Sequence, residues 1–329
     1  MSHQKQVNWG ILGAGKIAEK FAADLKHVKD ANLFAVASRK LDSAKDFAGA
    51  FNVQLYYEGY ENMLKNRDLD IVYIATPHVF HAEHALLCIA HKKAVLCEKP
   101  FAMNLNEVKK IVEAAQKNAV LVMEALWTAF LPHFEYVQNV LKNKVYGNII
   151  RLEADFGFPA DPNPSSRLFN KSLGGGSLLD IGIYPVFMAL ATLGKPEKIQ
   201  ADATFTDTGV DAACTIQFEY PEGVTALLKS TFLEETPTTA TFYCETGTVK
   251  IHSRFHEIAD VTLTDNSGNQ ETVCFDRKVN GYSYEAAHMT SLYKSGVKES
   301  PVMNFERSTN LMTLLDTIRQ KIGLSYKDA

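Results

Sequence analysis

Cysteine is sparse and scattered in this sequence of 329 residues. The five cysteines are odd in number and form no C-x-x-C pair. This pattern argues against a disulfide framework, a structural zinc site and a thiol redox motif. We therefore expect no metal site, and reduced, mostly buried thiols at Cys88, Cys97, Cys214, Cys244 and Cys274.

Long apolar runs and an excess of one charge are also absent. Apolar segments such as 71–76 fall far short of the roughly 20 residues that cross a bilayer, and the polar residues 1–6 lack the features of a signal peptide. The 34 Lys and Arg against 38 Asp and Glu leave a net charge of −4, without the basic surface that nucleic acid or anionic lipid requires. These absences predict a cytoplasmic protein with a small-molecule ligand, and no nucleic-acid or membrane partner.

The first part of the sequence alternates short β-rich runs with segments of helical periodicity. Such alternation predicts parallel βαβ units, and hence a doubly wound α/β domain over residues 1–124. The strand candidates are residues 7–12, 33–37, 71–74, 94–97 and 120–123, and the helix candidates are residues 16–26, 41–51, 60–66, 81–90 and 105–118.

The pattern changes after about residue 125. Turn signals then separate mostly strand-like runs, which predicts an α+β domain over residues 125–329 with a mostly antiparallel sheet. A loop rich in proline and glycine at 159–176 is long enough to suggest a function. The helix candidates are 132–143, 177–193, 284–294 and 305–322, and the strand candidates are 148–158 and several runs between 198 and 275.

A glycine-rich turn follows the first strand candidate, with the sequence G-A-G-K-I-A at residues 13–18. In a G-x-G-x-x-A turn the glycines allow a tight bend and let a pyrophosphate approach the N-terminus of the next helix. The strand–turn–helix context favours dinucleotide binding over an ordinary glycine turn. The expected cofactor-binding residues are Gly13, Ala14, Gly15, Lys16 and Ile17.

The end of the second strand candidate bears on which dinucleotide binds. NAD sites place Asp or Glu there for the ribose 2′-hydroxyl, whereas this sequence has Ser38, Arg39 and Lys40. A guanidinium can bind a 2′-phosphate through two hydrogen bonds, and the neighbouring hydroxyl and ammonium can add to it. We expect NADP to be preferred, with NAD possible; the alternative is that Arg39 and Lys40 are a solvated basic pair.

Two further motifs carry groups suited to hydride transfer. Lys99 follows the strand candidate 94–97, at the edge of the sheet where ligands bind. Three glycines at 174–176 permit close backbone approach, Ser177 is a plausible helix cap, and Asp180 and Tyr184 are spaced to share one helix face. Tyr184 can accept the proton of an alcohol if the Lys99 cation lowers the pKa of its phenol from about 10, and Asp180 can orient the substrate or Lys99. Taken singly, each of these residues is also explained as a structural one.

Together the three motifs resemble those of the Gfo/Idh/MocA oxidoreductases, and the resemblance runs through nearly the whole chain. Within that family the sequence is similar to the dimeric dihydrodiol dehydrogenases, which also act as NADP-dependent D-xylose dehydrogenases. The strings that carry this likeness are L-C-E-K-P at 96–100, M-E-A-L-W-T at 123–128 and Y-S-Y-E-A at 282–286.

The resemblance implies a Rossmann domain, a C-terminal domain whose large open sheet forms a homodimer face, a catalytic Lys99 and Tyr184, and a cis bond between Lys99 and Pro100. It further implies that the segment after the fourth strand lines the cofactor cleft, and that aromatic side chains wall the active-site mouth. The residues so implicated are Thr76, Pro77, His78, His81, Glu98 and Lys99 for the cofactor, and Trp127, Phe156 and Arg167, with Asp180 and Tyr184, for the substrate.

The leading hypothesis is therefore an NAD(P)-dependent oxidoreductase acting on a carbinol of a sugar, polyol or trans-dihydrodiol. One alternative is an NAD-linked dehydrogenase of inositol-like cyclitols, for which His at 184 and an acidic residue near 37 or 38 are typical. Another is a dinucleotide-binding regulator without turnover. The proline-rich residues 159–164 border the expected substrate cleft and leave the substrate open.

Overall fold

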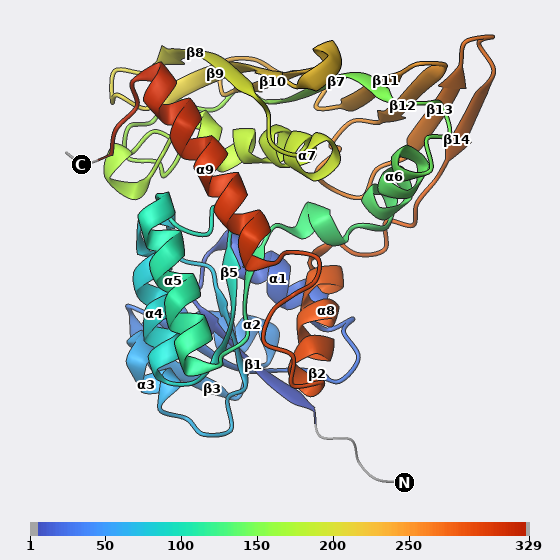
Figure 1. The fold of residues 1–329 in the computed structure, drawn as a ribbon. Helices are drawn as coiled ribbons and strands as arrows, with labels where there is room; N and C mark the ends of the chain where they lie inside the picture. The colour runs from blue at the N-terminus through green and yellow to red at the C-terminus, as the bar shows by residue number, and fades with distance from the viewer. Residues whose placement is uncertain (1–5, 327–329) are drawn as a thin grey trace, which may run out of the picture. The chain divides into compact units, whose positions relative to one another are not determined.

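The computed structural model describes residues 6–326 and divides the chain into two compact units. The first unit comprises the residues up to Trp127 together with Lys278–Thr309, and the second comprises Thr128–Arg277 and the residues from Asn310 onward. Figure 1 shows the chain coloured along its length. The stretch 1–6, in which no signal peptide is expected, lies outside the described residues except for Gln6.

A six-stranded sheet forms the centre of the first unit, in the order β3-β2-β1-β4-β5-β6, and all of its neighbouring strands are parallel. This confirms the predicted Rossmann-type sheet. The sequence analysis missed β3, an edge strand of only four residues, each at least partly exposed. The strands are β1 Val7–Leu12, β2 Ala31–Ser38, β3 Leu55–Glu58, β4 Ile71–Ile74, β5 Ala94–Glu98 and β6 Val122–Ala125.

The helices of the first unit agree with the predicted ranges to within a few residues. Asn104 caps α5, because its Oδ1 accepts a hydrogen bond of 3.0 Å from the backbone N–H of Glu107. The late helix α8 packs against α1, and the buried Asp24 carboxylate accepts the backbone N–H of Gly281 at 2.8 Å. The helices are α1 Lys16–Leu25, α2 Leu41–Phe51, α3 Tyr60–Leu64, α4 His81–Ala90, α5 Leu105–Asn118 and α8 Tyr282–Lys294, and α9 Phe305–Ile322 continues into the second unit.

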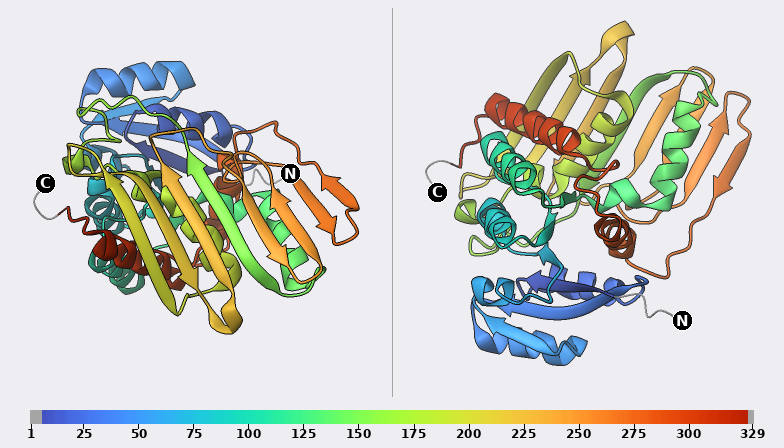
Figure 2. Two further views of the ribbon diagram at one scale, coloured as in Figure 1. Left: turned by 90° about the horizontal axis from the view of Figure 1, so that it is seen from above. Right: turned by 60° about the horizontal axis from the view of Figure 1, so that its bottom comes forward.

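The second unit contains an eight-stranded sheet, seen face-on in the left view of Figure 2. Its order is β14-β13-β12-β11-β7-β10-β9-β8, and only β7 and β10 pair in parallel, which confirms the predicted, mostly antiparallel sheet. The strands are β7 Ile149–Gly157, β8 Lys198–Phe205, β9 Asp211–Glu219, β10 Thr225–Thr231, β11 Ala240–Cys244, β12 Gly247–Ile251, β13 Val261–Asp265 and β14 Gln270–Val273.

Within the second unit, helices α6 Pro132–Lys142 and α7 Ile183–Leu193 lie on one side of this sheet (Figure 1). No helix of the described chain crosses the other side (Figure 2, left), which we call the open face. A shallow hollow of about 440 Å³ lies on this face, across the neighbouring strands β7, β10, β9 and β8. Its lining residues include Thr215, Gln217 and Lys229. The sheet therefore has one covered and one uncovered face.

The segment Lys171–Leu193 has the length and apolar composition of a membrane-crossing helix, with a mean hydropathy of 1.6. However, 78% of its most apolar window is buried inside the protein, and every residue of α7 from Ile183 to Leu190 is buried. A helix that is apolar all round is expected where a core surrounds it. Packing against the covered face of the sheet explains its composition.

The cysteines follow the prediction: all five are free, four are buried, and Cys274 is exposed. Burial raises the pKa of the Cys88 and Cys97 thiols well above the ordinary value, so both remain uncharged. Over residues 6–326 no three His, Cys, Asp or Glu side chains are grouped as metal ligands.

Candidate functional site

The predicted dinucleotide turn lies between β1 and α1. Gly13 has a φ of +97°, and a Cβ there would lie 2.9 Å from the carbonyl oxygen of Ala75, so only glycine fits. A Cβ on Gly15 would meet nothing within 4 Å, and Gly15 precedes α1 without a side-chain cap. Open space in front of uncapped helix N–H groups is what a pyrophosphate requires. The residues present therefore fit a dinucleotide, with the exposed Lys16 beside this space.

The three residues expected to read the ribose follow at the end of β2, where Arg39 and Lys40 are exposed. The Arg39 guanidinium acts electrostatically on two aromatic side chains that the sequence did not single out, Tyr60 and His84. Burial is the larger cause, and the positive charge of Arg39 the smaller one, that together lower the pKa of His84 to about 4. Burial also raises the pKa of the Tyr60 phenol, and the Arg39 charge partly offsets this rise. The Tyr60 and His84 rings lie edge to face, 4.6 Å apart. Arg39 therefore lies near aromatic groups from α3 and α4.

The predicted cofactor residues after β4 include a histidine that joins two loops. His81 is fully buried, and its ring nitrogens lie 2.7 Å from the carbonyl oxygen of Pro100 and 2.8 Å from that of Thr76. Burial lowers the pKa of His81 to about 4. Direct contact of His81 with a cofactor stays a prediction, as it does for Pro77 and His78; in the structure His81 ties the segment after β4 to the loop that carries Lys99.

Lys99 directly follows β5, and its peptide bond to Pro100 is cis, as expected. The preceding carboxylate, Glu98, accepts the Tyr73 hydroxyl through one oxygen and the backbone N–H of Lys99, at 3.2 Å, through the other. Glu285 is fully buried on α8 and interacts with Glu98, and its own burial holds its pKa well above the ordinary value. The Glu98 carboxylate thus links the start of the Lys99 loop to Tyr73 on β4.

Trp127, predicted to wall the substrate site, belongs to the first unit and is 6% exposed. Its ring stacks on that of Tyr282 at 4.4 Å. Tyr282 begins α8 and stands in one of the sequence strings that carried the family resemblance. The stack thus brings two of these strings, distant in the sequence, into contact.

In the second unit the glycine-rich block leads into a π-helical turn, Leu178–Gly182, and then into α7. The expectation that Ser177 caps a regular helix is wrong. Ser177 Oγ instead donates to Asp211 Oδ2 at 2.7 Å. Asp211 Oδ2 also accepts a hydrogen bond of 2.6 Å from the backbone N–H of Leu178. Burial raises the pKa of Asp211 to about 6. Asp211, on β9, is the cap, and π turns of this kind occur frequently at functional sites.

The glycines at 174–176 allow this segment to pack closely against other residues of the same chain. A Cβ on Gly175 would lie 2.6 Å from the carbonyl oxygen of Leu168, and the Gly176 N–H donates to that oxygen at 2.9 Å. The loop is thereby held so that Arg167 reaches Asp180, with Nη1 2.8 Å from Oδ1 and Nη2 3.4 Å from Oδ2. Two predicted substrate residues are thus paired, with Asp180 8% exposed and Arg167 57% exposed.

Tyr184 lies in the first turn of α7 and is 6% exposed. Its ring centroid is 5.9 Å from that of Phe156, another predicted substrate residue, and 5.0 Å from that of His256. Phe156 and His256 stack at 4.0 Å. Sequence reasoning missed His256, since an isolated histidine outside any motif gives no signal.

Comparison with known proteins agrees with this geometry. Residues 7–126 match the family described as "Oxidoreductase family, NAD-binding Rossmann fold", and residues 134–250 match the "GFO/IDH/MocA C-terminal domain". The sequence is 35% identical to trans-1,2-dihydrobenzene-1,2-diol dehydrogenase of Xenopus laevis, covering 97% of this chain and 98% of that protein. The chain belongs to the Gfo/Idh/MocA family. The human protein of the same name is 32% identical at the same coverage.

Solved structures of this family extend the likeness. KijD10, a 3-ketoreductase from Actinomadura kijaniata solved with NADP and TDP-benzene, superposes with a TM-score of 0.86 at 26% identity, over 97% of this chain and 98% of that one. Aldose-aldose oxidoreductase from Caulobacter crescentus shares the fold, with a TM-score of 0.87 at 21% identity over 96% and 97% of the two chains. As a Gfo/Idh/MocA protein, this chain is an NAD(P)-binding oxidoreductase acting on CH–OH groups.

Proposed function

We propose that this protein oxidises a carbinol of a sugar, polyol or trans-dihydrodiol with NADP as the preferred cofactor. The observation that carries the proposal is the arrangement around Tyr184: a buried phenol beside Phe156, four residues after an aspartate that Arg167 holds in place. The names of the relatives, a diol dehydrogenase and a sugar ketoreductase, support the substrate class.

Each proposed catalytic residue has one task. Tyr184 accepts the proton of the substrate hydroxyl, Asp180 orients the substrate, and Lys99 supplies the positive charge that favours loss of that proton. A bound nicotinamide supplies the hydride acceptor. Assistance of this general acid–base type is worth about 10²- to 10⁴-fold in rate.

The preference for NADP rests on the end of β2. Ser38, Arg39 and Lys40 offer a hydroxyl and two cations where a carboxylate would repel a 2′-phosphate. In this proposal residues 1–124 bind the dinucleotide, and residues 125–329 bind the substrate and the partner subunit.

We further propose a cytoplasmic homodimer through the open face. The open face lacks any covering helix in the described chain (Figure 2). Leu227 on β10 is 40% exposed and lines the hollow on this face. Because an arginine there would replace an apolar contact with a long, charged side chain that the interface must desolvate, Leu227→Arg should convert the dimer to a monomer in light scattering. A wild-type protein that is already monomeric at micromolar concentration would contradict this part of the proposal.

The function is tested by NADPH formation from D-xylose, beside NAD⁺ and beside Tyr184→Phe. We expect turnover with NADP⁺, and a loss of about 10²- to 10⁴-fold in kcat for the variant at unchanged NADPH affinity. Tyr220→Phe is the matched control, because Tyr220 is another buried tyrosine of the second unit. Equal activity of Tyr184→Phe and Tyr220→Phe would refute the assignment of the base.

A further inference from the structure

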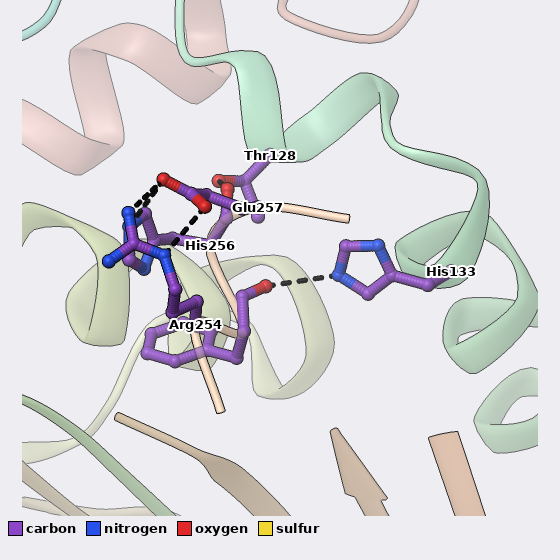
Figure 3. A network of polar contacts seen from close by, with 6 residues as sticks. Thr128, His133, Arg254, His256 and Glu257 are labelled. Carbon is purple, nitrogen blue, oxygen red and sulfur yellow. Dashed lines mark hydrogen bonds and ion pairs between the residues drawn. The ribbon is translucent and has the colours of Figure 1, made fainter. Parts of the chain in front are cut away.

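A short turn between β12 and β13 brings a histidine to Tyr184. The turn comprises residues 254–257 and is shown in Figure 3. Arg254 has a φ of +64°, in the left-handed region that residues other than glycine seldom adopt. Such a conformation is strained and persists only where the surroundings enforce it, which is common at functional sites.

An ion pair closes the turn on itself. Arg254 Nε lies 2.6 Å from Glu257 Oε2, and a second contact joins Nη2 to Oε1 of the same carboxylate (Figure 3). The Glu257 N–H also donates to the Arg254 carbonyl at 2.7 Å. Bidentate pairing of this kind fixes geometry as well as charge.

Side chains near α6 hold the turn from outside. Thr128 Oγ1 donates to the carbonyl of His256 at 2.9 Å, and His133 Nε2 lies 3.0 Å from the carbonyl of Phe255 (Figure 3). Because burial lowers the pKa of His133 to about 4, this imidazole is neutral and its Nε2–H donates. Four side chains thus fix the position of one residue, His256.

The imidazole of His256 is 4% exposed and has two different surroundings. Its face stacks on Phe156 at 4.0 Å and approaches Tyr184 at 5.0 Å, while Nε2 lies 3.7 Å from Glu257 Oε1. If packing were its only role, any aromatic side chain could take the place of His256. An imidazole adds two nitrogen atoms that can form hydrogen bonds, directly beside the proposed base.

We propose that His256 is a specificity-determining residue that selects substrates with a polar atom on each side of the reacting carbon. Resting on the proposed function, this assigns the Tyr184 site to pyranoses and polyols: one neighbouring hydroxyl binds Asp180, and a second hydroxyl or the ring oxygen binds His256. A trans-1,2-dihydrodiol has a hydroxyl on one side only and an apolar vinyl carbon on the other. A site built to hydrogen-bond a polar group discriminates strongly against analogues that lack it, because its own polar group is then left unpaired.

The test compares kcat/KM for D-xylose and for trans-1,2-dihydrobenzene-1,2-diol in the wild type and in His256→Phe, which keeps the ring on Phe156 and removes both nitrogens. We expect kcat/KM for D-xylose to fall about 10- to 100-fold and that for the dihydrodiol to stay within about threefold, with partial recovery for D-xylose in His256→Gln. His252→Phe, at a nearby histidine that bonds Thr262, should leave the ratio of the two substrates unchanged.

An equal loss on both substrates would mean that His256 only packs, and no loss on either substrate would mean that it contacts no substrate atom; either result overturns the inference. Calorimetric binding of D-xylose and D-glucose in the presence of NADP⁺ separates this inference from the proposed function. Sugar binding without turnover, lost in His256→Phe, would support the inference while refuting the oxidation. A wild type that binds neither sugar overturns the inference even if it oxidises the dihydrodiol.

Discussion

The carboxyl edge of the parallel sheet and the surroundings of Tyr184 are assembled in opposite ways. Along the parallel sheet, Gly13, Arg39, Thr76 and Lys99 each follow the end of a strand, so chain order and position at the edge are linked. Around Tyr184, Phe156 comes from β7, Arg167 from a loop and His256 from a turn between β12 and β13. Parallel βαβ repetition makes a site readable from the sequence, whereas an antiparallel sheet with long connections does not.

The two regions also differ in how glycine is used. Gly15 borders open space, whereas a Cβ on Gly176 would lie 2.2 Å from Asp211 Oδ1. One glycine leaves room for a ligand, and the other lets the protein pack against itself. Substitutions can therefore separate the two uses.

The largest effect is expected for Gly176→Ala. Its φ of +122° and the clash with the buried Asp211 should remove the cap of the π-helical turn and lower the free energy of unfolding by about 3 kcal/mol or more. Gly15→Ala should leave that free energy unchanged and lower only NADPH affinity, about tenfold or more. Urea denaturation and fluorescence titration of NADPH measure the two quantities, and equal destabilisation by both variants would remove the contrast.

A smaller effect, confined to the first unit, is expected for Arg39→Ala. Losing charge-assisted hydrogen bonds to a 2′-phosphate, worth about 1.5–3 kcal/mol, should raise the KM for NADP⁺ about 10- to 100-fold and leave the KM for NAD⁺ within about twofold. Lys65→Ala, another exposed cation of this unit, is the control. If the NADP⁺ and NAD⁺ constants rise together, Arg39 does not read the phosphate.

At Glu285 the expected effect depends on pH and vanishes near pH 4.5. Since burial raises its folded pKa, the folded state retains a proton that the unfolded chain releases above about pH 4.3. The stabilisation that this retained proton gives the folded state is therefore complete below about pH 4.3. As the pH rises above that value, the free energy of unfolding falls by up to about 1.4 kcal/mol per pH unit, until the folded pKa of Glu285 is reached. Glu285→Gln should raise the Tm at pH 8 and bring no gain at pH 4.5, whereas Glu113→Gln, at an exposed carboxylate of α5, should change neither. A gain that is the same at both pH values would exclude titration as its cause.

Hydrophobic periodicity and glycine motifs were sufficient to predict both sheets, the limits of α2, α4, α5 and α9, and the pairing of an α/β with an α+β region. They failed at β3, which is too short to show a periodic pattern, and at Ser177, because the cap comes from Asp211 on a distant strand. Residue type alone also could not predict that Arg167 pairs with Asp180, because this pairing depends on a loop that packs closely against Gly175. His256 was beyond sequence reasoning, since its importance comes entirely from the rings that surround it.

The first unit is discontinuous, and this has a consequence for synthesis on the ribosome. Trp9 on β1 donates to Thr290, and Phe21 on α1 meets Tyr282, yet both partners follow the whole of Thr128–Arg277 in the chain. A nascent chain exposes these N-terminal rings until most of the protein has been made, so the unit that begins first is completed late. A stop codon shortly before residue 278 would therefore damage the N-terminal fold as well as remove the end of the protein.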